Sequence, residues 1–164
     1  MNILNQFSYP LIGIGVTIGI FLLLTRYFKV RWYITTITQL VIIALFVSGF
    51  VILRPGGGNV TSAADALDQI GNGRPTFVDF YSNYCSGCLA FSPTIDRLEA
   101  DLGDEFNFLR IDIHTNLGRS LREELGFSFT PEFVLYDGQG NEVWRDHVPP
   151  TSGQLAQVRS GGTP

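Results

Sequence analysis

The pattern of apolar and charged positions divides the chain into two unlike parts. Residues 11–25 and 32–53 contain no charged residue, whereas every acidic residue lies at or beyond Asp65. A helix over 32–53 rises about 1.5 Å per residue and spans a hydrocarbon core of roughly 30 Å. The first run reaches that length when its aromatic flanks are included. The pattern therefore predicts a membrane anchor over residues 1–54, with transmembrane helices at about 8–28 and 32–53.

A cleaved signal peptide is the alternative interpretation of the first apolar run. No lysine or arginine precedes the run, and no small-residue cleavage site follows it. Aromatic residues, which gather at membrane interfaces, lie at both of its ends. These features favour a retained helix in the lipid bilayer.

Basic residues predict the orientation of this anchor. Arg26, Lys29 and Arg31 lie in the short connection between the two predicted helices, and Arg54 follows the second helix. Because basic residues concentrate in cytoplasmic loops, the excess in the connection places it in the cytoplasm. We therefore expect a multi-pass protein of the cell (inner) membrane with an extracytoplasmic soluble domain.

After a Gly-rich linker at residues 55–60, the pattern changes to short alternating helical and strand-like segments. We expect helices near 62–70, 89–102, 117–125 and 151–159, and strands near 76–81, 106–113, 133–136 and 142–147. The order α-β-α-β-α-β-β-α predicts an α/β fold, a mixed sheet flanked by helices, over residues 61–160. Residues 161–164 form a tail.

Charge narrows the partners of the soluble part. Beyond Arg54 there are seven basic and fifteen acidic residues, a formal net charge of −8. Such a domain is repelled by anionic lipid and by nucleic acid. We expect no nucleic-acid partner, and we interpret the charges as a solvated surface.

The only two cysteines of the chain, Cys85 and Cys88, stand between the predicted strand 76–81 and the predicted helix 89–102. A helix N-terminus offers unpaired N–H groups and partial positive charge, which stabilise a thiolate. This placement lowers a cysteine pKa from about 8.5 toward roughly 7 or below. We predict that Cys85 is the accessible nucleophile, and that Cys88, one turn further on, is a shielded resolving thiol.

Two other uses of a CxxC pair are disfavoured. A structural zinc ion needs four ligands, and the only histidines, His114 and His147, have no ligand spacing to each other. A purely structural disulfide between residues three apart closes so short a loop that it removes little unfolded-state entropy. No metal site is expected.

Three further features stand out in this part of the chain. Asp79 lies in the middle of the apolar strand, where a charge is costly without a purpose. Alternation along the strand places it on the same face as Phe77 and opposite Val78. Pro93 interrupts the following helical pattern, and the pair Thr130-Pro131 precedes a later apolar run.

Together these motifs resemble the thioredoxin family, and the resemblance covers about residues 61–160. The segment Arg74-Pro-Thr-Phe-Val-Asp-Phe-Tyr-Ser-Asn-Tyr-Cys85 is most similar to membrane-anchored thioredoxin-like proteins of cytochrome biogenesis and extracytoplasmic disulfide reduction. The resemblance implies a thiol-disulfide oxidoreductase whose redox-active disulfide, Cys85–Cys88, is its only cofactor, and whose substrates are protein disulfides.

The resemblance also implies the roles of neighbouring residues. Asp79 is the buried carboxylate that accepts the proton of Cys88. Pro131 has a cis peptide bond and lies beside the two sulfurs. The backbone of Thr130 offers hydrogen bonds to a bound substrate strand.

The chain departs from the usual family pattern around these residues. Tyr84 stands where the family usually has tryptophan, and Ser86-Gly87 replaces Gly-Pro within the motif, where the two residues help to set the reduction potential. All three are predicted to contact substrate. Phe108 stands where many thioredoxins have a lysine near the buried aspartate, which implies different proton handling at Asp79.

Two classes of function follow. One is a reductase of protein disulfides supplied by a membrane electron-donor protein. The other is an accessory subunit of a larger membrane complex that uses the fold for docking. A GxxxG pair, Gly15 and Gly19, and the polar residues 35–39 in the second helix are compatible with helix partners. The CxxC motif and Asp79 favour catalysis, because docking requires neither.

Overall fold

The computed structural model describes residues 3–164 and contains a four-stranded sheet. The strands are β1 (Thr76–Tyr81), β2 (Asn107–Asp112), β3 (Glu132–Tyr136) and β4 (Glu142–Asp146), in the order β2-β1-β3-β4. Strand β1 is parallel to β2 and antiparallel to β3, and β3 is antiparallel to β4. The sheet is therefore mixed, as the sequence predicts.

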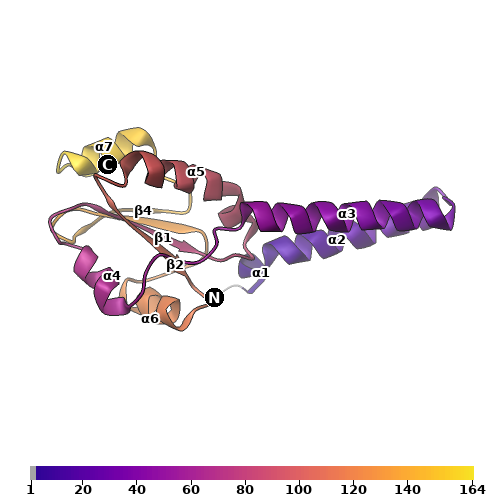
Figure 1. Cartoon of the computed structure of the whole chain (residues 1–164), viewed down its shortest axis with the longest axis horizontal. Coiled ribbons are helices and arrows are strands. Elements are labelled where there is room, and N and C mark those ends of the chain that lie inside the picture. Colours follow the sequence, from indigo (N-terminus) through magenta and orange to yellow (C-terminus); the bar gives the residue numbers. More distant parts are fainter. Residues whose placement is uncertain (1–2) are drawn as a thin grey trace.

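Four helices cover the two faces of this sheet (Figure 1). Helices α5 (Ser86–Leu102) and α7 (Ser152–Arg159) lie on one face, and α4 (Ala63–Gln69) and α6 (Asn116–Glu124) lie on the other. The predicted order of elements after residue 60 is confirmed, with ends that move by no more than a few residues.

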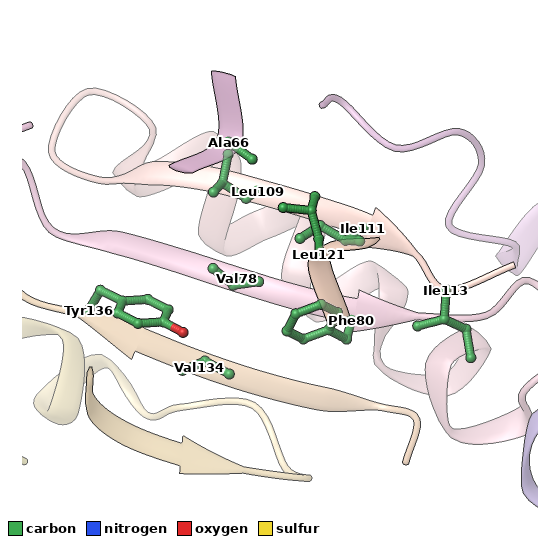
Figure 2. Packing of buried hydrophobic residues seen from close by; sticks show 9 residues of the cluster. All are labelled: Ala66, Val78, Phe80, Leu109, Ile111, Ile113, Leu121, Val134 and Tyr136. Atoms are coloured by element: carbon green, nitrogen blue, oxygen red, sulfur yellow. The ribbon is translucent and has the colours of Figure 1, made fainter. Parts of the chain in front are cut away.

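Alternation along β1 divides the hydrophobic core into two layers. Val78 and Phe80 point toward α4 and α6, where they meet Ala66, Leu121 and the apolar residues of β2 (Figure 2). Phe77 points to the other face and joins the cluster beneath α5 and α7. The predicted alternation of β1 is therefore confirmed, and it sends Asp79 to the α5 face.

Before the sheet, two long apolar helices form a hairpin that projects from the domain (Figure 1). Helix α2 (Ser8–Leu22) continues into the π-helical turn η1 (Leu23–Tyr27), and α3 (Trp32–Leu53) returns; α1 (Ile3–Gln6) precedes them. Both long segments have the length and composition needed to cross a membrane, and neither is buried within the protein. The predicted second helix matches α3.

The first long helix differs from the prediction in its last turns. A single helix over about 8–28 was expected, but the chain widens to η1 after Leu22. The Thr25 hydroxyl donates to the Phe21 carbonyl at 2.7 Å, the group that accepts from the Thr25 amide in a regular α-helix. Such back-bonding by a threonine side chain competes with the α-helical hydrogen bonds, but Thr17 and Thr36 make the same bond within regular α-helix.

Two glycines, Gly13 and Gly49, allow the two hairpin helices to approach closely. A Cβ atom at Gly13 would lie 3.2 Å from the Phe46 ring, and one at Gly49 would lie 2.9 Å from the Tyr9 hydroxyl. At Gly15 and Gly19, no atom of any other described segment lies within 4 Å of that position. The GxxxG pair therefore faces away from α3.

The linker between hairpin and domain is fixed at two points. The Gly56 amide donates to the Asn83 side chain at 3.1 Å, and the Gly56 carbonyl accepts from the Tyr81 hydroxyl at 3.0 Å. The Asn59 side chain then bonds the Phe108 carbonyl and the Arg110 amide along the free edge of β2. An amide side chain thus satisfies backbone groups that an open sheet edge leaves unpaired.

Candidate active site

The junction between β1 and α5 places both cysteines at one helix start. Strand β1 ends at Tyr81, and Cys85 is the N-cap residue of α5, with φ −87° and ψ 124°. The amides of Gly87 and Cys88 in the first turn of α5 lie where they can stabilise the Cys85 sulfur. Cys88 lies in the first turn, and both cysteines are free thiols.

Hydrogen bonding lowers the pKa of Cys85 to about 6. The hydrogen bond with the Cys88 side chain is the largest cause, and backbone N–H groups of Cys88 and Gly87, together with Thr130, also favour the thiolate. Burial opposes them but does not prevail. Cys85 is therefore predominantly a thiolate at neutral pH, the reactive form of a cysteine.

The pKa of Cys88 shifts in the opposite direction. Burial raises it strongly, and the adjacent sulfur of Cys85 raises it further. The Ser82 amide, at 3.5 Å from the Cys88 sulfur, is too weak a donor to compensate. The two thiols thus have unequal chemistry: Cys85 has the thiolate character that a nucleophile needs, and Cys88 holds a proton that must be removed before it can react.

The predicted accessibility of Cys85 is wrong. Cys85 is 1% exposed and Cys88 is 4% exposed, so the nucleophile is no more open than the resolving thiol. The prediction considered only the position of Cys85 at a helix start. Burial comes instead from residues near the N-terminus of the chain, which lie against this region.

The loop before β3 forms the other side of the site and contains Thr130 and Pro131. The peptide bond between them is cis, as predicted. The Cys85 sulfur lies 3.6 Å from the Thr130 carbonyl oxygen. A Cβ atom at Gly87 would lie 3.1 Å from Pro131 and 3.8 Å from the Cys85 sulfur. The small residue at Gly87 therefore lets the proline loop close against the sulfur.

Asp79 is buried on the same side of the sheet, at 3% exposure. Its pKa is raised to about 7, first by burial, against the lowering effect of Arg110. A carboxyl group with such a pKa exchanges protons readily at neutral pH. This is the property that the predicted proton acceptor for Cys88 needs.

The cation near Asp79 comes from a position that the sequence pattern did not single out. Arg110 pairs with Asp79 across β1 and β2, and its Nε lies 3.7 Å from Asp79 Oδ2. Phe108 pairs with Phe77 and lies in the core, as expected of a residue without charge. The sequence did contain a signal, because Arg110 is a charged residue within the mostly apolar strand β2. Its role becomes clear only from the strand pairing, which places it opposite Asp79.

Arg110 also connects the buried carboxyl to the surface. Its Nη1 lies 2.6 Å from Asp96 and 3.8 Å from Glu99, both on α5 and both partly exposed. Its Nε and Nη2 atoms are buried and have no hydrogen-bond partner among residues 3–164. The guanidinium is thus held mainly by ionic attraction, between one buried carboxyl and two at the surface.

The predicted substrate-contacting residues do lie around Cys85, but the chain itself contacts them. Tyr84 stacks on Phe7 and Phe50, with ring centroids 5.4 and 6.0 Å apart. The Ser86 hydroxyl lies 2.9 Å from that of Ser8. Sequence reasoning missed these contacts, because nothing in the local pattern of residues 5–9 indicates that they fold back onto the motif.

Ser82 and His114 were also missed. Ser82 is fully buried beside Cys88, and its hydroxyl lies 3.0 Å from His114 Nε2. His114 in turn packs against the Tyr84 ring, with centroids 5.9 Å apart. Ser82 follows β1 directly and could have been suspected from that position, whereas His114 is brought in by the end of β2.

The asymmetry of the two thiols yields a titration prediction. We expect the ultraviolet absorbance of thiolate in the reduced protein to appear with a midpoint near pH 6. Cys88→Ala should raise that midpoint, because it removes the main stabilising hydrogen bond, and Cys85→Ser should abolish the transition. A wild-type midpoint near the value of about 8.5 of an ordinary cysteine would contradict the assignment.

Asp79→Asn should stabilise the fold at alkaline pH. The pKa of Asp79 rises from 3.8 to about 7 on folding, so the folded form keeps a proton that the unfolded chain releases. Wild-type stability therefore falls as pH rises through this window and is lowest above it. We expect the variant to gain roughly 2–4 kcal/mol at pH 8 and little near pH 4.

Denaturant unfolding across this pH range measures the effect. Glu123→Gln, at an exposed carboxylate on α6, is the matched control and should leave the pH dependence unchanged. An equal slope of stability against pH in wild type and Asp79→Asn would show that Asp79 does not titrate as described.

Comparison with known proteins gives relatives with the same kind of domain. The chain is 26% identical over 110 residues to the thioredoxin-like protein HCF164 of Arabidopsis thaliana chloroplasts, covering 66% of this chain and 42% of that protein. It is 35% identical over 82 residues to the thiol:disulfide interchange protein TxlA homolog of Synechocystis, covering 49% and 43%. The chain thus spans less than half the length of these relatives.

Solved structures agree on the fold. Thioredoxin of Malassezia sympodialis superposes with a TM-score of 0.51 at 18% identity, covering 64% of this chain and 91% of that one. A mutant thioredoxin of Halobacterium salinarum gives 0.50 at 19%, covering 64% and 88%. The family model for thioredoxin matches residues 60–156, which is more than half of the chain. The chain therefore belongs to the thioredoxin family.

Proposed function

We propose that this protein is a membrane-anchored thiol-disulfide oxidoreductase that reduces protein disulfides on the extracytoplasmic side through the Cys85–Cys88 couple. The observation that carries the proposal is the opposite shift of the two thiol pKa values at one helix start. Asp79, with a pKa of about 7, supplies the remaining acid-base group. A domain used only for docking has no need of this asymmetry.

The mechanism follows from these groups. The Cys85 thiolate attacks one sulfur of a substrate disulfide, forms a mixed disulfide and releases the other substrate sulfur as a thiolate, which takes a proton. Asp79 then accepts the Cys88 proton, and the Cys88 thiolate attacks Cys85. This step forms the Cys85–Cys88 disulfide and releases the second substrate thiolate. Two electrons have passed from the protein to the substrate.

Each cycle leaves an oxidised Cys85–Cys88 pair, which must be reduced again. We propose a membrane electron-donor protein that carries its own dithiol, because thiol-disulfide exchange with such a donor reverses the steps above. Two helices long enough to cross a membrane keep the site near a donor of that kind. Because the sequence resembles thioredoxin-like proteins of cytochrome biogenesis, we propose that its substrates are protein disulfides of that process.

The proposed side of the membrane rests on charge. The turn that joins η1 to α3 lies at the far end of the hairpin from the domain (Figure 1), and Arg26, Lys29 and Arg31 lie in or beside that turn in the sequence. If the tip is cytoplasmic, both hairpin ends and the domain lie on the opposite side. In an oxidising compartment, a reductase of protein disulfides has substrates to act on.

One observation favours a second candidate function. Cys85 is 1% exposed, and the chain's own residues 5–9 bond to Ser86 and Thr130 on either side of it. A permanently closed site would suit an accessory subunit of a larger membrane complex in which the fold serves for docking. Isolation of a stoichiometric complex in which loss of either cysteine has no effect would support this alternative.

Trapping of mixed disulfides tests the proposed reaction. Cys88→Ala should accumulate covalent complexes with substrate proteins in the membrane, because the first attack proceeds and resolution cannot. Cys85→Ala should accumulate almost none, since the remaining thiol is protonated and buried. Non-reducing electrophoresis followed by mass spectrometry identifies the complexes.

Asp79→Asn serves as an additional variant in the same assay. It should leave the first attack nearly intact and slow resolution by roughly a hundredfold, the usual contribution of a general base. Equal trapping by both single cysteine variants would refute the assignment of nucleophile and resolving thiol. No trapping by either would favour the accessory-subunit alternative.

Topology is testable with an introduced cysteine, because native Cys85 is buried. We expect Gln139→Cys, at an exposed loop position in a variant without Cys85 and Cys88, to react with a membrane-impermeant maleimide added outside intact cells. Lys29→Cys in the same background is the matched control and should react only after the inner membrane is permeabilised. The reverse pattern would place the domain in the cytoplasm.

A further inference from the structure

Residues 5–9, here called the cover segment, run from α1 into the first turn of α2 and lie against the site. We infer that the cover segment occupies the substrate-binding face of the site and must be displaced before a disulfide reaches Cys85. The inference rests on the proposed function only in identifying that face, and the burial of Cys85 is independent of it.

Polar contacts of the cover segment fall on two of the residues predicted to meet substrate. The Ser86 amide, at the first turn of α5, donates to the Ser8 hydroxyl at 2.9 Å. The Thr130 hydroxyl donates to the Asn5 side-chain oxygen at 3.1 Å. These bonds lie on the α5 side and on the proline-loop side of Cys85, so the cover segment bridges the two walls of the site.

Backbone and ring contacts extend the cover over the residues that precede the motif. The Tyr9 amide donates to the Tyr84 carbonyl at 3.0 Å, and the Ser82 hydroxyl donates to the Gln6 carbonyl at 3.2 Å. The Phe7 ring stacks on Tyr84 and lies 5.3 Å, centroid to centroid, from His114. The cover segment thus contacts residues 82, 84 and 114 as well as the two walls of the site.

Burial shows that the cover is complete at the reacting atoms. Cys85 is 1% exposed and Thr130 is fully buried, although both belong to loops at the surface of the domain. The cover segment contains no cysteine, so it occupies Ser86 and Thr130, which are predicted to contact substrate, without offering a disulfide. It acts as an unreactive occupant that competes with substrate for the same surface.

The cover segment is also coupled to the hairpin. Tyr9 belongs to it, and the Tyr9 hydroxyl donates to the Phe46 carbonyl of α3 at 2.6 Å. The Tyr84 ring stacks on Phe7 of the cover segment and on Phe50 of α3. A shift of the two helices against the domain therefore moves the cover, which makes the hairpin the element through which a membrane partner would open the site.

The reactivity of Cys85 toward iodoacetamide tests the inference in the full-length reduced protein in lipid nanodiscs. The reaction is followed at about pH 8, where Cys85 is thiolate in every variant, so that changes in pKa do not alter the rate. Phe7→Ala and Ser8→Ala should each raise the alkylation rate by roughly twofold to tenfold, as expected from losing an aromatic or hydrogen-bonded contact. The double variant should exceed both.

Matched controls separate opening of the cover from loss of the fold. Phe28→Ala removes an aromatic ring at the far end of the hairpin and should leave the rate unchanged. Cys88, quantified in the same samples by mass spectrometry, should remain unreactive in all variants. Comparable labelling of both cysteines would mean that the contacts support the fold, and it would overturn the inference.

Two other results would also overturn it. One is an unchanged Cys85 rate in the double variant, and the other is wild-type Cys85 that already reacts as fast as an exposed thiolate. The assay contains no disulfide substrate, so its outcome stands whether or not the trapping experiment succeeds. A failed trap with faster alkylation in the variants would reject the proposed reaction and keep the cover.

Discussion

The structure depends on one junction, at which a buried strand delivers a thiol to the first turn of a helix. The partial positive charge and free N–H groups of that turn favour an anion at Cys85, while the protein interior disfavours any charge there. The pKa of about 6 shows that hydrogen bonding prevails at Cys85. One turn further on, burial prevails at Cys88. A displacement of one turn along a helix thus produces two thiols whose pKa values shift in opposite directions.

The same balance between burial and compensation governs Asp79. A carboxyl group in a sheet interior needs a partner, and Arg110 provides one from the adjacent strand. The compensation is partial, because the contact is 3.7 Å long and Arg110 also serves Asp96 and Glu99. Partial compensation is what leaves the pKa of Asp79 near 7. A tighter ion pair would hold Asp79 ionised at neutral pH but would make it a poorer base.

Local patterns allowed much of this to be predicted from sequence. The bounds of β1 follow from an apolar run that only Asp79 interrupts, and those of α3 follow from a run without charge. The cis Pro131 beside Cys85 follows from the family resemblance. The role of Arg110 was missed because it depends on the register between β1 and β2, which the pattern of one strand does not contain. Phe108 drew attention to a missing lysine, not to the arginine two residues later.

The burial of Cys85 could not have been predicted in the same way. It arises from contacts between residues about 78 positions apart, such as Ser8 with Ser86, and no periodicity or motif links the two segments. Serine and phenylalanine near a membrane helix are compatible with many surroundings. Only the return of α3 to the domain, beside the start of α2, brings residues 5–9 to the motif.

The cover segment also bears on the oxidation of the Cys85 thiolate. A low-pKa thiolate is the form of cysteine that small oxidants attack most readily, with sulfenic acid as the first product. Cys85 combines that form with 1% exposure. In an oxidising compartment, an open thiolate would be consumed by oxidants as well as by substrates. Residues 5–9 keep Cys85 out of solvent, so the conditions that activate the sulfur and those that expose it are set by different parts of the chain.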